Sequence, residues 1–277
     1  MNMPMQFSVL IPVYFKDQAV HFAQALDSIA KQTLLPNEIV IVKDGPINAE
    51  NEAVLTHFAS ISPVPLIITA LPTNQGISAA LNQGICVCSY AYIARMDADD
   101  IAKPLRFEKQ IAFLETHPEV DILGSNVDEF LGEPTHIISQ RRVPSSHADI
   151  CKAMKIRCPF NHPSLIYKKE AILKVGGYIH FYNLEDWHLW ARLFLNGAQM
   201  ANIPESLLLF RATAQMFKRR GGIKYTASDI KLQWFFYKIG LTNFWEMARN
   251  LIVRIPVRLA PASVREFFYK HILRSLN

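Results

Sequence analysis

Three aspartates within four residues are the first feature of this sequence that points to chemistry. The apolar residues 90–96 predict a strand, which leads directly into Asp97, Ala98, Asp99 and Asp100. While the chain stays extended, residues 97 and 99 point to the same side, about 7 Å apart. Two such carboxylates form a hard-oxygen site for Mg²⁺ or Mn²⁺, which commonly bridge carboxylates and a substrate diphosphate. A solvated acidic loop is the alternative, and the position after a strand favours the metal site.

A further carboxylate and a glycine-containing turn follow other predicted strands. Asp44 comes directly after the apolar run 39–42, where its carboxylate can accept a hydrogen bond from a base N–H or a ribose hydroxyl. The alternative is a turn-forming aspartate before Gly45. In residues 74–78, Gly76 permits close backbone approach and the following helix N-terminus favours an anion. That segment alone also fits an ordinary helix start.

Two adjacent carboxylates, Glu185 and Asp186, precede an apolar helical stripe within the predicted helix 183–196. One of them is a candidate general base for a sugar hydroxyl. Spacing alone favours another role, in which Asn183 is the N-cap and Asp186 lies three residues later in a weak capping-box analogue.

Three more polar residues are candidates for a diphosphate or acceptor site. His162 is a lone histidine beside a proline, and a structural role is favoured for it. Arg219 and Arg220 precede two glycines, and this basic pair either clamps a diphosphate or is a solvated charge run. The sequence has no Ser/His/Asp or Cys/His nucleophile pattern, and its four cysteines are expected to be reduced thiols.

The elements that must position these residues alternate along the chain. Apolar runs predict strands at 7–13, 39–42, 66–70 and 90–96, and helical spacing predicts helices at 22–29, 50–59 and 77–85. This alternation predicts an α/β fold with a mostly parallel sheet covered by helices on both faces. After Asp100 the pattern predicts helices at 104–117 and 148–156, and strands at 120–130 and 164–167.

Composition and charge divide the chain into two parts. Its 277 residues are 50% apolar and 19% charged, which excludes a disordered chain, and no apolar stretch is long enough to predict a spanning helix. Residues 1–214 carry 17 Lys/Arg and 21 Asp/Glu, a net charge of −4, whereas residues 215–277 carry 12 and 3, a net charge of +9. We therefore expect a main domain at 1–214 and a basic helical tail at 215–277.

The tail interleaves basic and apolar residues, which suggests an anionic membrane surface or a phosphorylated partner. Its helical apolar face fits either a helix in the membrane interface or a terminal helix packed on its own domain, and the charge asymmetry favours the membrane. The face consists of Phe244, Met247, Ala248, Leu251, Ile252 and Ile255. Nucleic acid is the competing partner, but the negative charge of residues 1–214 disfavours it.

Taken together, five short motifs resemble those of glycosyltransferase family 2, in the expected order. They are SVLIPVY at 8–14, VKDG at 42–45, NQG at 74–76, MDADD at 96–100 and EDW at 185–187. The resemblance covers about residues 5–215 and implies the Rossmann-like GT-A fold and an inverting transfer. The tail is similar to that of bacterial members that build exopolysaccharide or O-antigen repeats.

The resemblance also implies a role for each matching residue. Pro12 and Tyr14 would line the nucleotide pocket, Asp44 would bind the uracil or ribose, and Gly76 would let the backbone approach the base.

For the reacting end of the donor, the resemblance implies that Asp97 contacts the ribose or the metal. Asp99 would be the main ligand to Mn²⁺ or Mg²⁺. Asp186 matches the family's catalytic base, with Glu185 beside it, and this outweighs the preference for a capping role.

The sequence departs from the family pattern at two places. Lys43 and Pro46 replace the usual first Asp and the Ser around Asp44, and residues 210–213 lack the His that follows a Tyr-Arg pair in many relatives. A third protein ligand to the metal is therefore left open. The Gln-x-x-Arg-Trp motif of processive synthases is also absent, which favours transfer of a single sugar.

The sequence thus predicts a metal-dependent inverting glycosyltransferase that moves one sugar from a nucleotide-sugar, a UDP-sugar by preference. The acceptor would be a glycan or an undecaprenyl-diphosphate-linked sugar at the cytoplasmic face of the membrane, in bacterial surface polysaccharide synthesis. A sugar nucleotidyltransferase is one alternative, although residues 14–17 lack the Gly- and Arg-rich loop that it needs. A non-catalytic sugar-nucleotide-binding protein is the other.

Overall fold

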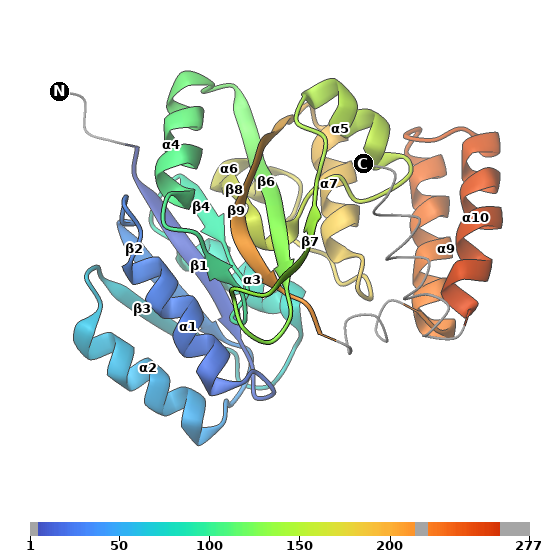
Figure 1. Ribbon diagram of the computed structural model, residues 1–277. Helices are drawn as coiled ribbons and strands as arrows, with labels where there is room; N and C mark the ends of the chain where they lie inside the picture. Colours follow the sequence, from blue (N-terminus) through green and yellow to red (C-terminus); the bar gives the residue numbers. More distant parts are fainter. Residues whose placement is uncertain (1–4, 214–220, 261–277) are drawn as a thin grey trace.

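The computed structural model describes residues 5–213 and 221–260, which form a central β-sheet with helices on both faces (Figure 1). In this part of the chain the sheet has nine strands in the order β3-β2-β1-β4-β8-β6-β9-β5, with β7 paired to β6 beside that path. The strands are β1 (Phe7–Val13), β2 (Glu38–Lys43), β3 (Leu66–Ala70), β4 (Tyr92–Arg95), β5 (Ile101–Ala102), β6 (Val120–Phe130), β7 (Ile137–Arg141), β8 (Ile166–Lys168) and β9 (Gln199–Arg211).

The first half of the sheet is parallel, as expected, because β3, β2, β1 and β4 all run in the same direction. Beyond β4 the sheet is mixed. Strand β8 is antiparallel to both β4 and β6, whereas β6 and β9 are parallel to each other. The long strand β9 has no counterpart among the strands expected from the sequence. Its apolar pattern is broken at Pro204 and Glu205, where its pairing with β6 also shifts register.

The helices alternate with the strands along most of the chain. They are α1 (Ala19–Ala30), α2 (Ala49–Ile61), α3 (Ile77–Val87), α4 (Arg106–Thr116), α5 (His147–Met154), α6 (Lys169–Lys174), α7 (Glu185–Leu195), α9 (Ile223–Lys238) and α10 (Phe244–Leu259), with a short 3₁₀ turn, η1, at His162–Ser164. Part of the strand expected at 164–167 is therefore the end of this turn, and β8 begins at Ile166.

Alternate residues of the parallel strands are buried in two separate apolar cores, one on each face of the sheet. Val9 and Ile11 of β1 pack with α1, α2 and α4, while Leu10 packs with α3 and α7 on the opposite face. This division follows from the two-residue period of a strand, and it explains why β1 is buried along its whole length. Helices on both faces of an α/β sheet are thus confirmed.

Helices α9 and α10 lie side by side next to α7, at the edge of the molecule (Figure 1). Leu232 and Phe236 of α9 are buried in the same core as Trp187 and Trp190 of α7. No helix within the described ranges 5–213 and 221–260 combines the length and the apolar character needed to cross a bilayer.

Gly84 sets how closely α3 approaches the sheet. A Cβ atom at this position would lie 2.1 Å from Leu10 Cδ1 and 2.9 Å from Val42 Cγ2. We therefore expect Gly84→Ala to lower the free energy of unfolding by about 1–3 kcal/mol, as overpacking does in other cores. Urea titration followed by circular dichroism measures this change.

The intrinsic helix effect has the opposite sign, because alanine is favoured over glycine at an open helix site by about 1 kcal/mol. Ala53→Gly at an exposed position of α2 calibrates that effect in the same protein. A Gly84→Ala protein as stable as the parent would contradict the close packing of α3.

Candidate active site

The candidate site lies at the carboxyl ends of β1, β2 and β4. The Asp44 N–H donates to Val13 O at 2.8 Å, and the Met96 N–H donates to Leu10 O at 3.1 Å. These bonds continue the parallel pairing just past the strands, so Tyr14, Asp44 and Asp97 follow three neighbouring strands at one edge of the sheet. This edge is where open α/β folds bind their ligands.

Asp44 holds the turn that precedes α3. Its side chain is buried, and the carboxylate accepts the backbone N–H groups of Gln75 at 2.7 Å and Gly76 at 2.9 Å. The carboxylate therefore fixes the loop between β3 and α3 at the end of β2. Asp44 thus positions the loop before α3, in addition to the turn-forming role considered from sequence.

The two glycines of this region have different structural roles. At Gly45 a Cβ would lie 2.5 Å from the backbone nitrogen of Asn74, so Gly45 allows the two loops to touch. Gly76 has open space around it, and it is required for its φ of +89°, a left-handed conformation that glycine adopts readily. Pro12 is buried in β1, while Tyr14 is partly buried and its N–H donates to Asp17 Oδ2 at 2.9 Å.

The three aspartates after β4 form a compact cluster. Ligand atoms of Asp97, Asp99 and Asp100 all lie within 4.8 Å of one another. The chain turns at residues 98 and 99 instead of staying extended, which brings the carboxylates closer than the spacing of about 7 Å expected for a strand. The turn also adds Asp100 to the pair predicted as metal ligands.

Asp97 is held by a buried arginine that sequence reasoning missed. Arg95 is 2% exposed, and its Nη1 and Nη2 donate to the two carboxylate oxygens of Asp97 at 3.1 and 2.5 Å. Burial disfavours the charge of Arg95, but Asp97 and other neighbours outweigh this effect and raise the Arg95 pKa. The sequence does contain a signal for this pair, because Arg95 is a lone charge within an apolar run and directly precedes the acidic residues.

Asp100 is fully buried and its carboxyl pKa is raised well above its ordinary value, chiefly by burial and then by the charges of Asp99 and Asp97. One oxygen accepts the Arg211 N–H at 2.9 Å, and the other has no hydrogen-bond partner within the described residues. A divalent cation is bound by hard oxygen ligands of this kind. The donor set and the unpartnered buried oxygen therefore fit Mg²⁺ or Mn²⁺.

The second acidic pair begins α7. Asp186 Oδ1 accepts the Trp187 N–H at 2.7 Å, and the Cys158 thiol donates to Oδ2 at 3.6 Å. The N-cap residue is Leu184, without a side-chain capping bond, so the alternative of Asn183 as the cap is wrong. Asn183 instead takes a left-handed φ of 55° immediately before the helix.

Arg95 connects the two acidic groups electrostatically. Burial and the charge of Asp186 raise the pKa of Glu185 to about 7, and the charge of Arg95 opposes this shift. The same guanidinium binds Asp97, so the aspartate cluster and the Glu185–Asp186 pair both lie within range of one buried cation.

His162 belongs to the same neighbourhood. Its Nε2 lies 2.8 Å from the Tyr178 hydroxyl, and its ring meets Trp190 edge to face. Burial, followed by the charge of Arg95, lowers the His162 pKa well below its ordinary value, so the ring is neutral near pH 7. Arg219 and Arg220, the other candidates for a diphosphate site, lie outside the described residues.

Comparison with protein families identifies the class of this protein. The model described as glycosyl transferase family 2 matches residues 8–176, more than half of the chain. The chain belongs to this family and is a glycosyltransferase, as the motifs predicted.

Two curated relatives match nearly the whole chain. The UDP-Gal:α-D-GlcNAc-diphosphoundecaprenol β-1,3-galactosyltransferase of Escherichia coli is 38% identical over 269 residues, which cover 97% of each protein. The amylovoran biosynthesis glycosyltransferase AmsE of Erwinia amylovora is 37% identical over 264 residues, or 95% of this chain and 98% of AmsE.

Solved structures confirm the GT-A fold. Residues 1–349 of Staphylococcus aureus TarS, in complex with UDP-GlcNAc, match 90% of this chain and 72% of that one with a TM-score of 0.67 and 16% identity. The mannosyltransferase PcManGT of Pyrobaculum calidifontis, in complex with GDP-Man and Mn²⁺, matches 96% of this chain and 81% of that one with a TM-score of 0.62 and 16% identity.

The raised pKa of Glu185 predicts a pH-dependent contribution to stability. A carboxyl whose pKa rises from 4.5 to about 7 on folding binds its proton more tightly in the folded protein. Its contribution is therefore fully present below about pH 4.5 and is lost as the pH rises through 7. We expect Glu185→Gln to gain stability relative to the parent between pH 5 and pH 8, measured by urea unfolding at both values.

Glu119→Gln, at an exposed position before β6, is the matched control, because it removes a carboxylate without changing the site. If the Glu185→Gln and Glu119→Gln proteins showed the same change between the two pH values, the buried environment assigned to Glu185 would be wrong.

Proposed function

We propose that this glycosyltransferase moves one sugar from a UDP-sugar to a glycan or lipid-linked acceptor, with inversion at the anomeric carbon, in bacterial surface polysaccharide synthesis. The observation that carries the proposal is the cluster of Asp97, Asp99 and Asp100 that follows β4 at the carboxyl edge of the sheet, with Asp97 held by Arg95. The names of the two curated relatives, one acting with UDP-Gal and one in amylovoran biosynthesis, support the donor and the pathway class.

The donor site is proposed along the ends of β1 and β2. Pro12 and Tyr14 would line the nucleoside pocket, next to the loop that Asp44 ties to the start of α3. Gly76 leaves the backbone of that loop open on one side. The base or ribose of the nucleotide would bind there, with Asp44 as a hydrogen-bond acceptor.

Asp97, Asp99 and Asp100 would hold a Mn²⁺ or Mg²⁺ ion beside the donor diphosphate. When bound, a divalent cation stabilises the negative charge that develops on a leaving diphosphate. Arg95 keeps Asp97 in place, and the backbone N–H of Arg211 keeps Asp100 in place, so the cluster is organised by its own neighbours.

Asp186 is proposed as the general base, with Glu185 beside it. Its carboxylate would accept the proton of the acceptor hydroxyl, while the hydroxyl oxygen forms a bond to the anomeric carbon from the face opposite the nucleotide. The bond between that carbon and the diphosphate oxygen breaks, and its electron pair leaves with UDP. The position at the first turn of α7, with Oδ1 bound to the Trp187 N–H, fixes the carboxylate.

The acceptor is proposed to be a sugar on an undecaprenyl diphosphate carrier, by analogy with the E. coli relative. Such an acceptor lies in the cytoplasmic membrane, so the enzyme would act as a peripheral protein at the inner face. No role for nucleic acid is proposed.

Replacing the base tests the catalytic assignment. We expect Asp186→Asn to lower kcat for UDP release by about 10²–10⁴-fold, because general base catalysis contributes that much. Binding of UDP, measured by calorimetry with Mn²⁺, should stay within twofold of the parent. The assay uses a panel of UDP-sugars and a synthetic GlcNAc-diphosphoryl lipid.

Asp149→Asn is the matched control, since Asp149 is an exposed carboxylate in the first turn of another helix, α5. Full transfer activity of the Asp186→Asn enzyme would remove Asp186 from the mechanism.

The metal site is tested separately. We expect EDTA to abolish UDP release and added Mn²⁺ to restore it. Asp99→Asn should reduce kcat by at least about a hundredfold, because charge stabilisation by a metal contributes several kcal/mol. The exposed Asp27→Asn on α1 should behave as the parent enzyme. Transfer that persists unchanged in EDTA would rule out metal dependence.

A further inference from the structure

We propose that the outward surface of the α9–α10 hairpin is a docking surface for an anionic lipid bilayer. The proposal rests on the lipid-linked acceptor of the proposed function and assigns the part of the protein that meets the membrane. By hairpin surface we mean the exposed side chains of residues 223–259, and four aromatic and four basic residues on it carry the argument.

Four aromatic side chains form a continuous exposed group where the two helices meet. The ring centroids are 5.5 Å apart for Trp234 and Tyr237, 6.4 Å for Tyr237 and Phe244, and 5.5 Å for Phe244 and Trp245. Trp234 is 50% exposed and Trp245 is 78% exposed. Tryptophan and tyrosine are enriched where proteins meet the interface of a bilayer, because each ring is apolar with one polar edge.

The charges around these rings are of one sign. Lys224, Lys231 and Lys238 are exposed on α9 at intervals of seven residues, on the same face as Trp234, and Arg249 is exposed on α10. None of these four forms an ion pair with an acidic residue in the part of the chain that the structure describes. Residues 221–260 place no exposed carboxylate beside them.

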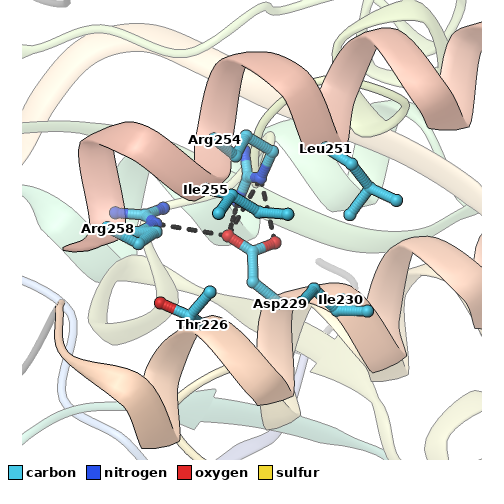
Figure 2. Close-up of a pocket in the computed structure, with 7 residues that line it drawn as sticks. All are labelled: Thr226, Asp229, Ile230, Leu251, Arg254, Ile255 and Arg258. Carbon is cyan, nitrogen blue, oxygen red and sulfur yellow. Dashed lines mark hydrogen bonds and ion pairs between the residues drawn. The ribbon is translucent and has the colours of Figure 1, made fainter.

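Both acidic residues of the hairpin are paired with basic residues, and Asp229 is also buried. Asp229 lies between the helices, where it pairs with Arg254 at 2.8 Å and with Arg258 at 3.2 Å (Figure 2). Glu246 caps α10 and pairs with Lys155 at 3.1 Å. The unpaired charges of the outward surface are therefore positive, which complements an anionic bilayer.

The apolar face that the sequence indicated for α10 is only partly at this surface. Met247 is buried, and Leu251 and Ile255 face α9 around the Asp229 ion pairs (Figure 2). Packing within the protein accounts for these three residues. Phe244 and Ile252 of the same predicted face stay exposed beside Trp245, where no described residue covers them.

The hairpin also contacts the helix that carries the proposed base. Phe236 of α9 packs edge to face on Trp187 at 5.3 Å, and Arg254 of α10 lies over the same indole at 4.9 Å. Trp187 directly follows Asp186. A bilayer bound to the hairpin would therefore lie on the two helices that pack directly against the helix carrying the proposed base. This arrangement would keep the enzyme close to an acceptor whose carrier stays in the membrane.

The test is co-sedimentation of the full-length protein with vesicles of phosphatidylglycerol and phosphatidylcholine in equal parts, against phosphatidylcholine alone. We expect binding to the anionic vesicles. Lys231→Gln/Lys238→Gln should weaken it about 25-fold, since each basic residue near the surface contributes about fivefold. Trp234→Ala/Trp245→Ala should weaken binding to the anionic vesicles at least tenfold. Controls are Lys31→Gln/Lys174→Gln and Ile61→Ala/Leu131→Ala, exposed residues elsewhere on the protein.

The same samples are heated with and without UDP and Mn²⁺, because a ligand of the folded state raises Tm. A retained shift shows that each variant is folded and that the donor site is intact. Absence of vesicle binding by the parent, or unchanged binding by the tryptophan variant, overturns the docking surface while leaving the proposed function standing. A parent dimer that this variant converts to monomer also overturns it, since the surface then binds a second copy. Vesicle binding without a UDP shift would instead count against the proposed function.

Discussion

Charges of both signs are buried together after β4, and the rest of the site depends on their mutual compensation. Arg95, Arg106 and Asp100 are almost completely inaccessible, and a buried charge is tolerated only with partners of opposite sign. Arg95 binds Asp97, while Arg106 donates to the Arg95 carbonyl at 2.8 Å. Burial lowers the Arg106 pKa to about 9, and Asp100 opposes that shift. The acidic cluster is thus fixed by the core beneath it.

Helix α3 contacts residues of both the proposed nucleotide side and the proposed acceptor side. The residues just before it, Gln75 and Gly76, are bound by Asp44, and further along the Asn82 amide forms two hydrogen bonds of 2.8 Å with the backbone of Tyr178. A Cβ at Gly177 would lie 2.5 Å from Asn82 Oδ1, so glycine is needed for this contact. Tyr178 then meets His162, near the Glu185–Asp186 pair. One helix therefore sets the distance between the proposed nucleotide side and the proposed acceptor side.

The C-terminal hairpin extends the same principle to the outside of the molecule. Its inner residues pack in the core around α7. Its two carboxylates are paired, Asp229 with two arginines of α10 and Glu246 with Lys155. What remains outward is aromatic and basic. The proposed membrane surface and the helix that carries the proposed base are thus joined by apolar packing.

The sequence by itself determined the parallel half of the sheet, because apolar runs such as 7–13 and 39–42 are buried on both faces and are therefore apolar at every position. It also determined the family and the candidate acids, since those motifs are contiguous. Strand β9, the Arg95–Asp97 pair, the tie from Asp44 to residues 75 and 76 and the inward face of α10 were decided only by tertiary structure. Most of these features join segments that are distant in the sequence, and local residue patterns do not show which distant partner a buried group will bind. Arg95 and Asp97 are close in the sequence, but their pairing depends on the burial of Arg95 in the folded protein.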